Sequence, residues 1–249
     1  NLKSLVAIGG GGAAMPQAVA QRLFDLYGLR YSEGYGLTET SPVITVNDQR
    51  NGGFRVGTVG RVINNVEVKI AEDGEILCKG PNVMMGYYKD QQLTDEVIKN
   101  GYFHTGDIGE VDKDGFLKIT DRKKEMFKTS GGKYIAPQLI ENAMKQSLFI
   151  EQIMVIGDGE KMPAAFIQPS FDFIQEWAKR KNLNVGTTPA EIASNPEVIS
   201  RVAQEVEKIN ERFGNWEKIK RFELTPDVWS IDGGHLTPTL KLKRKIVME

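Results

Sequence analysis

Residues 35–39 gather several side chains that could bind a nucleotide. Tyr35, Gly36, Thr38 and Glu39 place an aromatic ring, a glycine, a hydroxyl and a carboxylate close together in the chain. Such a set could stack a base, let a backbone approach closely, bind a phosphate and hold a hard cation. The same residues could also form a polar turn that caps a helix, and taken alone the segment favours that simpler structure.

A second isolated carboxylate, Asp107, follows Thr105 and Gly106. Asp107 could accept hydrogen bonds from the two hydroxyls of a ribose, as acidic residues do in nucleotide sites. A lone Asp in a loop is more often a turn former. The neighbouring His104 has only His235 as a histidine partner in the sequence, so a histidine metal site or a Ser-His-Asp triad has little support.

Two glycine-rich segments raise the question of a phosphate loop. Residues 9–12 are all glycine and follow an apolar run, but they lack the Gly-x-Gly-x-x-Gly spacing, and a plain tight loop explains them equally well. Gly131 and Gly132 precede a lysine. Phe127 stands where a Walker-type loop needs glycine, and Tyr134 stands where it needs Ser or Thr. We therefore reject a Walker-type site.

The carboxyl end is rich in lysine. Lys241, Lys243 and Lys245 alternate with apolar residues. A charge run usually marks a solvated tail. The alternation indicates an ordered edge instead, from which a lysine could reach a phosphate.

The composition is that of an ordinary globular protein. The 249 residues carry a net charge of -1, with 40% apolar and 26% charged residues, which gives no support for nucleic acid or an anionic membrane as main partner. The single cysteine, Cys78, cannot form an internal disulfide and favours a reducing compartment. No stretch approaches the roughly 20 apolar residues that a transmembrane helix needs.

The periodicity of apolar residues predicts two domains. Residues 5–8 and a helix from Pro16 form a strand-loop-helix unit, so the chain begins as α/β. Alternating strands joined by Asp-Gly turns then predict a small antiparallel, barrel-like β subdomain at about 55–120. An α+β domain follows, with a helix from Pro137, strands at 152–157 and 164–167, and an amphipathic helix at 198–213. We place the domains at 1–120 and 121–249, with a short hinge near 121–125 that contains no Gly or Pro.

The order of these motifs is more specific than any one of them. Tyr-Gly-Leu-Thr-Glu, Thr-Gly-Asp, Asp-Arg-Lys-Lys, Gly-Gly-Lys with Ile-Ala-Pro-x-x-Ile-Glu, and a terminal lysine motif follow one another from Gly9 to Lys245. In this order they resemble the adenylate-forming superfamily, which includes acyl-CoA synthetases, adenylation domains of peptide synthetases and firefly luciferase. The resemblance implies the end of a large domain, followed by a small mobile lid domain.

The resemblance also implies roles for the first group of residues. Gly10, Gly11 and Ala13 would belong to the loop that lines the acyl and adenine pocket. Tyr35 would stack the adenine of ATP or AMP, and Gly36 would lie beside the bound nucleotide.

The remaining chemistry is implied for five further residues. Thr38 would bind the adenylate phosphate and Glu39 would hold Mg²⁺, so Glu39 is the predicted metal ligand. Asp107 would bind the ribose hydroxyls, and Arg122 would lie beside the ribose and phosphate. Lys241 would complete the site for adenylation.

Three residues match the parts that serve domain motion and coenzyme A. Lys124 lies at the family's hinge position, two residues after Arg122. Gly131 and Gly132 would let the pantetheine arm of coenzyme A pass close to the backbone.

Residues 236–244 resemble the ending of long-chain fatty acyl-CoA synthetases. The resemblance implies a cytoplasmic long-chain fatty acid–CoA ligase that uses ATP and coenzyme A through an acyl-adenylate, and peripheral membrane contact would suit its substrate. The alternatives are an adenylation domain that feeds a carrier protein and a non-catalytic nucleotide-binding fragment. The family's Ser/Thr/Gly-rich loop ending in Pro-Lys is missing from this sequence. We therefore expect the chain to be a piece of a larger protein and inactive by itself.

Overall fold

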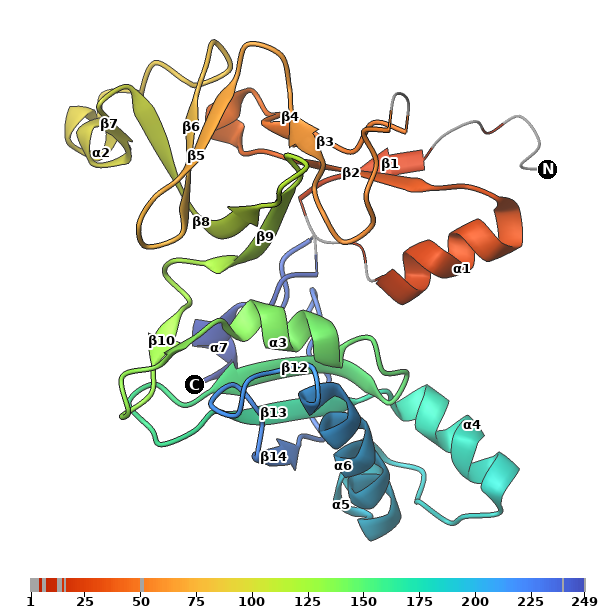
Figure 1. The fold of residues 1–249 in the computed structure, drawn as a ribbon. Coiled ribbons are helices and arrows are strands. Elements are labelled where there is room, and N and C mark those ends of the chain that lie inside the picture. Colours follow the sequence, from red (N-terminus) through yellow and green to blue (C-terminus); the bar gives the residue numbers. More distant parts are fainter. Residues whose placement is uncertain are drawn as a thin grey trace. The chain divides into compact units, whose positions relative to one another are not determined.

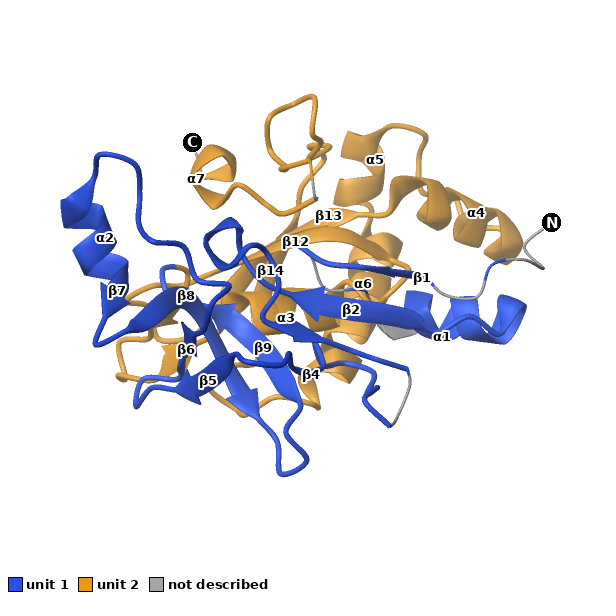
Figure 2. Ribbon diagram, turned by 90° about the horizontal axis from the view of Figure 1, so that it is seen from above, with its two compact units in different colours: residues 1–124 blue, residues 125–249 orange. Residues whose placement is uncertain are grey.

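A computed structural model describes Leu5, Met15 and residues 8–12, 17–49, 52–238 and 240–248. The chain divides into two compact units, which we call unit 1 (Asn1–Lys124) and unit 2 (Glu125–Glu249). Figure 1 shows the elements in chain order, and Figure 2 colours the two units separately. Each unit has a core of its own and is described by itself.

Unit 1 contains a mixed sheet and an antiparallel sheet. In the mixed sheet the strand order is β1-β2-β3-β4, and in the antiparallel sheet it is β5-β6-β8-β7, with β9 also paired to β8. The elements are β1 (Ile8–Gly10), α1 (Gln17–Tyr27), β2 (Tyr31–Tyr35), a 3-10 turn (Thr38–Thr40), β3 (Thr45–Val46), β4 (Arg61–Val62), β5 (Glu67–Ile70), β6 (Glu75–Lys79), α2 (Gln91–Val97), β7 (Ile98–Lys99), β8 (Tyr102–Val111) and β9 (Leu117–Arg122).

The first elements form the α/β segment that the sequence predicts. β1 and β2 are parallel, with Ile8 opposite Tyr31 and Gly10 opposite Glu33, and α1 connects them. A parallel pair needs a crossover of this kind, because its strands run in the same direction. The predicted helix start at Pro16 lies outside the described residues.

The predicted antiparallel β subdomain is present, but the described residues show no closed barrel: β5 remains an edge, and main-chain hydrogen bonds of Leu117 with Val59 and Gly60 join β9 to the segment before β4. β8 is the central strand: β6 pairs with it on one side, while β7 and β9 pair with successive parts of the other side. β5 pairs with β6 and forms an edge. β5 has four residues and β7 has two, and closing a barrel requires a continuous staggered ring of strands.

Unit 2 is built on a three-stranded sheet of order β12-β13-β14. β12 and β13 are antiparallel, whereas β13 and β14 are parallel. The elements are β10 (Phe127–Lys128), β11 (Tyr134–Ile135), α3 (Pro137–Met144), β12 (Ile150–Ile156), β13 (Ala164–Pro169), α4 (Phe171–Lys181), α5 (Pro189–Ser194), α6 (Pro196–Asn210), β14 (Arg221–Leu224) and α7 (Arg244–Val247).

The core of unit 2 lies between this sheet and three helices. Ile140 of α3, Ile174 of α4 and Val202 of α6 are all fully buried in one cluster with strand residues. The amphipathic pattern at 198–213 therefore predicts α6 correctly, but the helix ends earlier, at Asn210. The Asn210 amide bonds both main-chain groups of Ile219, at 2.8 and 3.0 Å, which ties the helix end to the segment before β14.

None of the helices in the described ranges is both long enough and apolar enough to span a lipid bilayer.

Candidate active site

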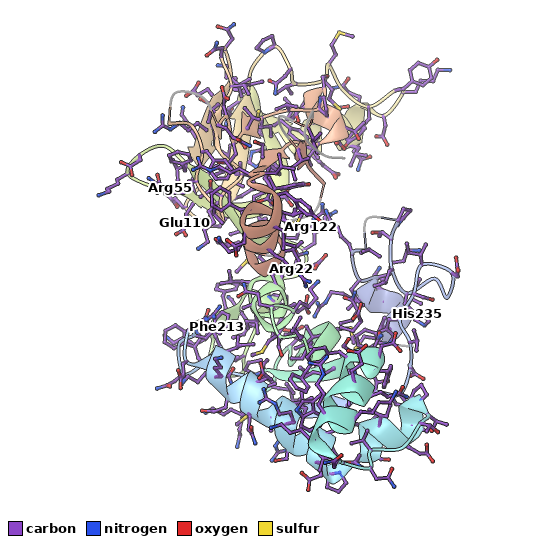
Figure 3. The ribbon with its side chains drawn as sticks, turned by 90° about the vertical axis from the view of Figure 1, so that its right-hand side faces the viewer. Arg22, Arg55, Glu110, Arg122, Phe213 and His235 are labelled. Carbon is purple, nitrogen blue, oxygen red and sulfur yellow. The ribbon has the colours of Figure 1, made fainter. Side chains whose placement is uncertain are left out.

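Three residues from separate motifs meet in unit 1. The Tyr35 hydroxyl, at the end of β2, donates a hydrogen bond to Asp107 Oδ2 at 2.7 Å. Arg122, the last residue of β9, places its Nε 3.3 Å from Asp107 Oδ1. Asp107 and Arg122 are register partners in β8 and β9, and Arg122 is labelled in Figure 3. The Asp107 carboxylate is thus held by a phenol on one oxygen and a guanidinium on the other.

Tyr35 is a buried residue, with 8% of its surface exposed. Its ring belongs to a core cluster with Ile44, Ile76 and Leu117. Burial, followed by the nearby Asp107 carboxylate, raises the pKa of the Tyr35 phenol, so the hydroxyl stays protonated and remains a donor. Little of the ring is left for contact with a base, so adenine stacking by Tyr35 stays a prediction.

A bulge in β8 aims Asp107. Glu75 of β6 lies opposite Ile108, but Leu77 lies opposite His104, so β8 has extra residues between these two pairs. The extra segment contains Gly106, whose φ of 72° lies in the left-handed region that favours glycine. Bulges re-aim side chains and are common beside active sites. This local geometry explains why glycine precedes the aspartate.

Glu75 fills the space beside this bulge, and the sequence analysis missed it. Its side chain is 5% exposed. Glu75 Oε1 accepts from the Gly106 N–H at 3.0 Å, and Oε2 lies 2.9 Å from both His104 Nδ1 and Lys123 Nζ. Burial alone raises the pKa of Glu75, but the hydrogen bonds from His104, Lys123 and Gly106 outweigh burial and lower it. The carboxylate is therefore charged. The sequence signal, a glutamate after an Asp-Gly turn, gives no hint of burial.

Glu39 lies in the 3-10 turn that follows β2. Its Oε1 accepts a hydrogen bond from the Tyr87 hydroxyl at 2.8 Å, and its main-chain oxygen accepts from the Met84 N–H at 2.8 Å. Thr38, which begins the turn, is exposed. The turn itself is held by Thr40, whose Oγ1 accepts from the Leu37 N–H at 2.9 Å. A capping motif and an accessible Thr-Glu pair therefore coexist in one segment.

The predicted glycines differ in what the backbone requires of them. A Cβ on Gly36 would come within 1.6 Å of the Pro42 oxygen, so packing alone demands glycine there. A Cβ on Gly10 would meet the Tyr31 hydroxyl at 2.3 Å, and one on Gly11 would meet the Gly34 oxygen at 2.9 Å. The main chain of β2 thus explains Gly11 without a ligand, whereas at Gly10 the atom in the way is the end of a flexible side chain, which could move aside.

Ala13 lies outside the described residues.

Unit 2 carries the other predicted residues. Gly132 has a φ of 75° and closes a turn by donating to the Thr129 oxygen at 2.8 Å, whereas a Cβ added to Gly131 would meet Thr129 Oγ1 only at 3.9 Å and would fit there. Lys241 is exposed and sits in a tight loop, in which its N–H donates to Thr237 Oγ1 at 3.0 Å. Lys124, the predicted hinge residue, is the last residue of unit 1.

A buried ion pair anchors the segment that follows Lys241. Arg244 begins α7, and its NH1 lies 2.5 Å from Glu141 Oε1 of α3. The same guanidinium donates to the Val155 carbonyl, and the Val155 N–H donates to Glu141 at 2.7 Å. Burial raises the pKa of Glu141, and the Arg244 charge acts against this effect. The chain just after Lys241 is thus fixed to the core of unit 2.

One carboxylate is the only protein ligand predicted for Mg²⁺. The described part of the chain contains no group of three or more His, Cys, Asp or Glu side chains that could enclose a metal. Mg²⁺ usually keeps several waters and binds through one or two carboxylates together with substrate phosphates. A single carboxylate at Glu39 fits that chemistry.

Comparison with known proteins matches both units. A family described as AMP-binding enzyme matches residues 1–88, and one described as AMP-binding enzyme C-terminal domain matches residues 125–229. The chain is 37% identical over 222 residues to the long-chain-fatty-acid–CoA ligase FadD15 of Mycobacterium bovis, covering 89% of this chain and 37% of that protein. It is 34% identical to human long-chain-fatty-acid–CoA ligase 1, in a match that covers 94% of this chain and 35% of that protein. The chain therefore spans little more than a third of these relatives.

Solved structures share the fold. The anthranilate CoA ligase AuaEII in complex with anthranoyl-AMP matches with a TM-score of 0.74 at 20% identity, covering 100% of this chain and 45% of that chain. The A-PCP didomain of carboxylic acid reductase from Segniliparus rugosus in complex with AMP matches with a TM-score of 0.75 at 21% identity, covering 97% and 33%.

Proposed function

Because this chain belongs to the adenylate-forming superfamily of AMP-binding enzymes, we propose that its full-length protein is a long-chain fatty acid–CoA ligase. The fatty acid carboxylate attacks the α-phosphate of ATP, which forms an acyl-adenylate and releases pyrophosphate. The thiol of coenzyme A then attacks the acyl carbon, and AMP leaves with the bonding electrons. The names of the relatives at 34 and 37% identity support the long-chain substrate.

The observation that carries the proposal is the Tyr35–Asp107–Arg122 cluster. A carboxylate is an acceptor on both of its oxygens, which is the chemistry that binding of the ribose hydroxyls requires of Asp107. Arg122 would also offer guanidinium donors to the neighbouring phosphate. Held this way, the nucleotide presents its α-phosphate in a fixed place.

Thr38 and Glu39 would serve the phosphate side of the site. The exposed Thr38 offers a hydroxyl to the α-phosphate, and Glu39 offers a carboxylate oriented by Tyr87. Mg²⁺ bound there would neutralise charge that develops on the phosphoryl oxygens.

Unit 2 would supply the remaining groups. Lys241 brings a positive charge to the α-phosphate during adenylation, where an added charge stabilises the transition state. Rotation at Lys124 would then remove Lys241 and bring the turn at Gly131 and Gly132 to the pantetheine arm of coenzyme A. A cytoplasmic location and inactivity of the 249-residue chain by itself remain predictions.

Replacing the lysine tests the assignment. In the full-length protein, Lys241→Ala should slow adenylation, measured as pyrophosphate release, by about 10²–10³-fold, the usual cost of losing one such stabilising group. Thioester formation from a supplied acyl-adenylate should be spared. Lys245→Ala, in the exposed part of α7, is the matched control and should behave as the wild type.

Two results would contradict the proposal. Unchanged adenylation by the Lys241 variant would remove the role of that lysine. Free coenzyme A should suffice as the only acceptor, so acyl transfer that occurs solely to a carrier protein would indicate an adenylation domain instead.

A further inference from the structure

Glu75 joins the two chain segments that carry the proposed ribose site. Gly106 directly precedes Asp107, and Lys123 directly follows Arg122. The Glu75 carboxylate accepts from the Gly106 N–H at 3.0 Å and from Lys123 Nζ at 2.9 Å. Both segments are therefore attached to one side chain of β6.

The attachment forms a closed ring of contacts. The Lys123 N–H donates to the Gly106 oxygen at 2.8 Å, so the two segments also bond each other. Lys123 Nζ lies 2.6 Å from Asp73 Oδ2, and the Glu75 N–H donates to Asp73 Oδ1 at 3.1 Å. The Asp-Gly turn before β6 thus holds the lysine from a second side.

The ring of contacts around Glu75 supplies hydrogen-bond partners to the bulge in β8. Residues in a bulge lose ladder hydrogen bonds to the neighbouring strand. In this bulge the Gly106 N–H finds the Glu75 carboxylate instead, and the Thr105 hydroxyl donates to the Ile76 oxygen at 2.8 Å. A buried carboxylate without hydrogen-bond donors would be strongly disfavoured. The Gly106 N–H and the Lys123 ammonium therefore keep Glu75 in place, and Glu75 in turn fixes the positions of Gly106 and Lys123.

We propose that Glu75 is a positioning residue for nucleotide recognition, which sets Asp107 and Arg122 at the spacing that a ribose requires. The inference rests on the proposed function, because it takes Asp107 as the ribose ligand. Glu75 itself touches no substrate. It acts through Gly106 and Lys123, and its effect should appear as selectivity for the ribose hydroxyls.

The test compares two nucleotides in the full-length protein. Calorimetry should show that the wild type binds AMP more tightly than 2′,3′-dideoxy-AMP, which lacks both hydroxyls. In Glu75→Gln the amide N–H₂ group faces either the Gly106 N–H or the Lys123 ammonium, both of which are donors, so the ring of contacts cannot close as before. We expect the ratio of the two affinities to fall by about tenfold, with little change for dideoxy-AMP, since one charge-assisted contact to each hydroxyl weakens.

Glu110→Gln is the matched control. Glu110 also lies on the antiparallel sheet, in β8, but its side chain is 64% exposed and pairs with an exposed Lys118 at 3.2 Å. Figure 3 labels both Glu110 and Arg122. The control should keep the wild-type ratio. Asp107→Asn shows how far the affinity ratio can fall, because it alters the proposed ribose ligand directly.

A further variant guards against misfolding of Glu75→Gln. Lys123→Met removes one donor from a side chain that is 46% exposed, and it should lower the ratio in the same direction by a smaller factor. If both variants kept the wild-type ratio, or lost affinity equally for both nucleotides, Glu75 would have no positioning role while the ribose role of Asp107 stood. A wild type that binds both nucleotides equally would overturn the ribose role and this inference together.

Discussion

Two buried glutamates, one in each unit, perform similar tasks under different conditions. Glu75 in unit 1 and Glu141 in unit 2 have side chains 5% and 8% exposed. Each accepts a backbone N–H from a neighbouring strand, at 3.0 and 2.7 Å, and each pairs with a basic side chain distant in sequence. Each also fixes a segment next to a proposed functional residue, Asp107 for Glu75 and Lys241 for Glu141.

The two carboxyls differ in how much water their partners keep. Lys123 and His104, beside Glu75, are 46% and 28% exposed, and their hydrogen bonds overcome burial and lower the pKa of Glu75. Arg244, beside Glu141, is 20% exposed, and burial dominates and raises the pKa of Glu141. The pKa values of two acids with the same kinds of partner thus shift in opposite directions. The reason is that the cost of desolvating a charge can exceed the attraction of its partner.

The largest effect is expected at Glu141. Glu141→Ala leaves the Arg244 guanidinium, which is only 20% exposed, without its carboxylate, and breaking a largely buried pair in this way costs up to about 3–5 kcal/mol. Hydrogen exchange should report the loss locally, as faster exchange of the β12 amides around Val155. Replacing both partners, Glu141→Leu with Arg244→Met, should recover most of the protection. A double variant as unprotected as the single one would show that the lost hydrogen bonds to the Val155 main chain, rather than the unpaired charge, carry the cost.

The next largest effect is expected in the pH dependence of stability, which should have opposite signs at Glu75 and Glu141. The lowered pKa of Glu75 means that its charged form stabilises the fold above the ordinary glutamate range, a contribution that is lost as the pH falls from that range through the lowered value. The raised pKa of Glu141 has the opposite sign: its favourable contribution is complete below the ordinary range and is lost as the pH rises through the raised value.

Urea unfolding of the two glutamine variants measures these signs. Glu75→Gln should cost about 1–3 kcal/mol near neutral pH, the size of a lost charge-assisted contact, and progressively less as the pH falls below the ordinary glutamate range. Glu141→Gln should become more stable relative to the wild type as the pH rises. Slopes of the same sign in both variants would contradict the contrast between the two sites.

Tyr35, Asp107 and Arg122 are predicted site residues because each belongs to a short local motif whose order along the chain resembles the adenylate-forming superfamily. Their contacts form only when β2, β8 and β9 come together, and the structure places all three within hydrogen-bonding or ion-pairing distance. The Asp73-Gly74 turn before β6 is equally local, and the structure forms it with Gly74 at a φ of 86°.

What the sequence could not predict depends on pairing between distant segments. The bulge at Gly106 arises from the register of β6 against β8, and whether the antiparallel strands close into a barrel depends on such pairing too. Glu75 looks like an ordinary surface glutamate in the sequence, and Glu141, although it ends the Ile-Ala-Pro-x-x-Ile-Glu motif, carries no sign there that it is buried. Only the partners Lys123 and Arg244, 48 and 103 residues away, make their burial tolerable.

The smallest effect is expected at a third glutamate, which isolates burial from pairing. Glu176 and Arg180 form an ion pair at 3.2 Å on α4, with side chains 65% and 73% exposed. Glu176→Gln should change the free energy of unfolding by about 0.5 kcal/mol or less, because water screens exposed pairs. Raising the salt to about 1 M, where the screening length is about 3 Å, should abolish even that difference. The cost of Glu141→Ala should persist in the same salt, since ions do not reach a buried pair. If high salt reduced both effects alike, solvent would reach Glu141, and the distinction between buried and exposed glutamate–arginine pairs in unit 2 would fail.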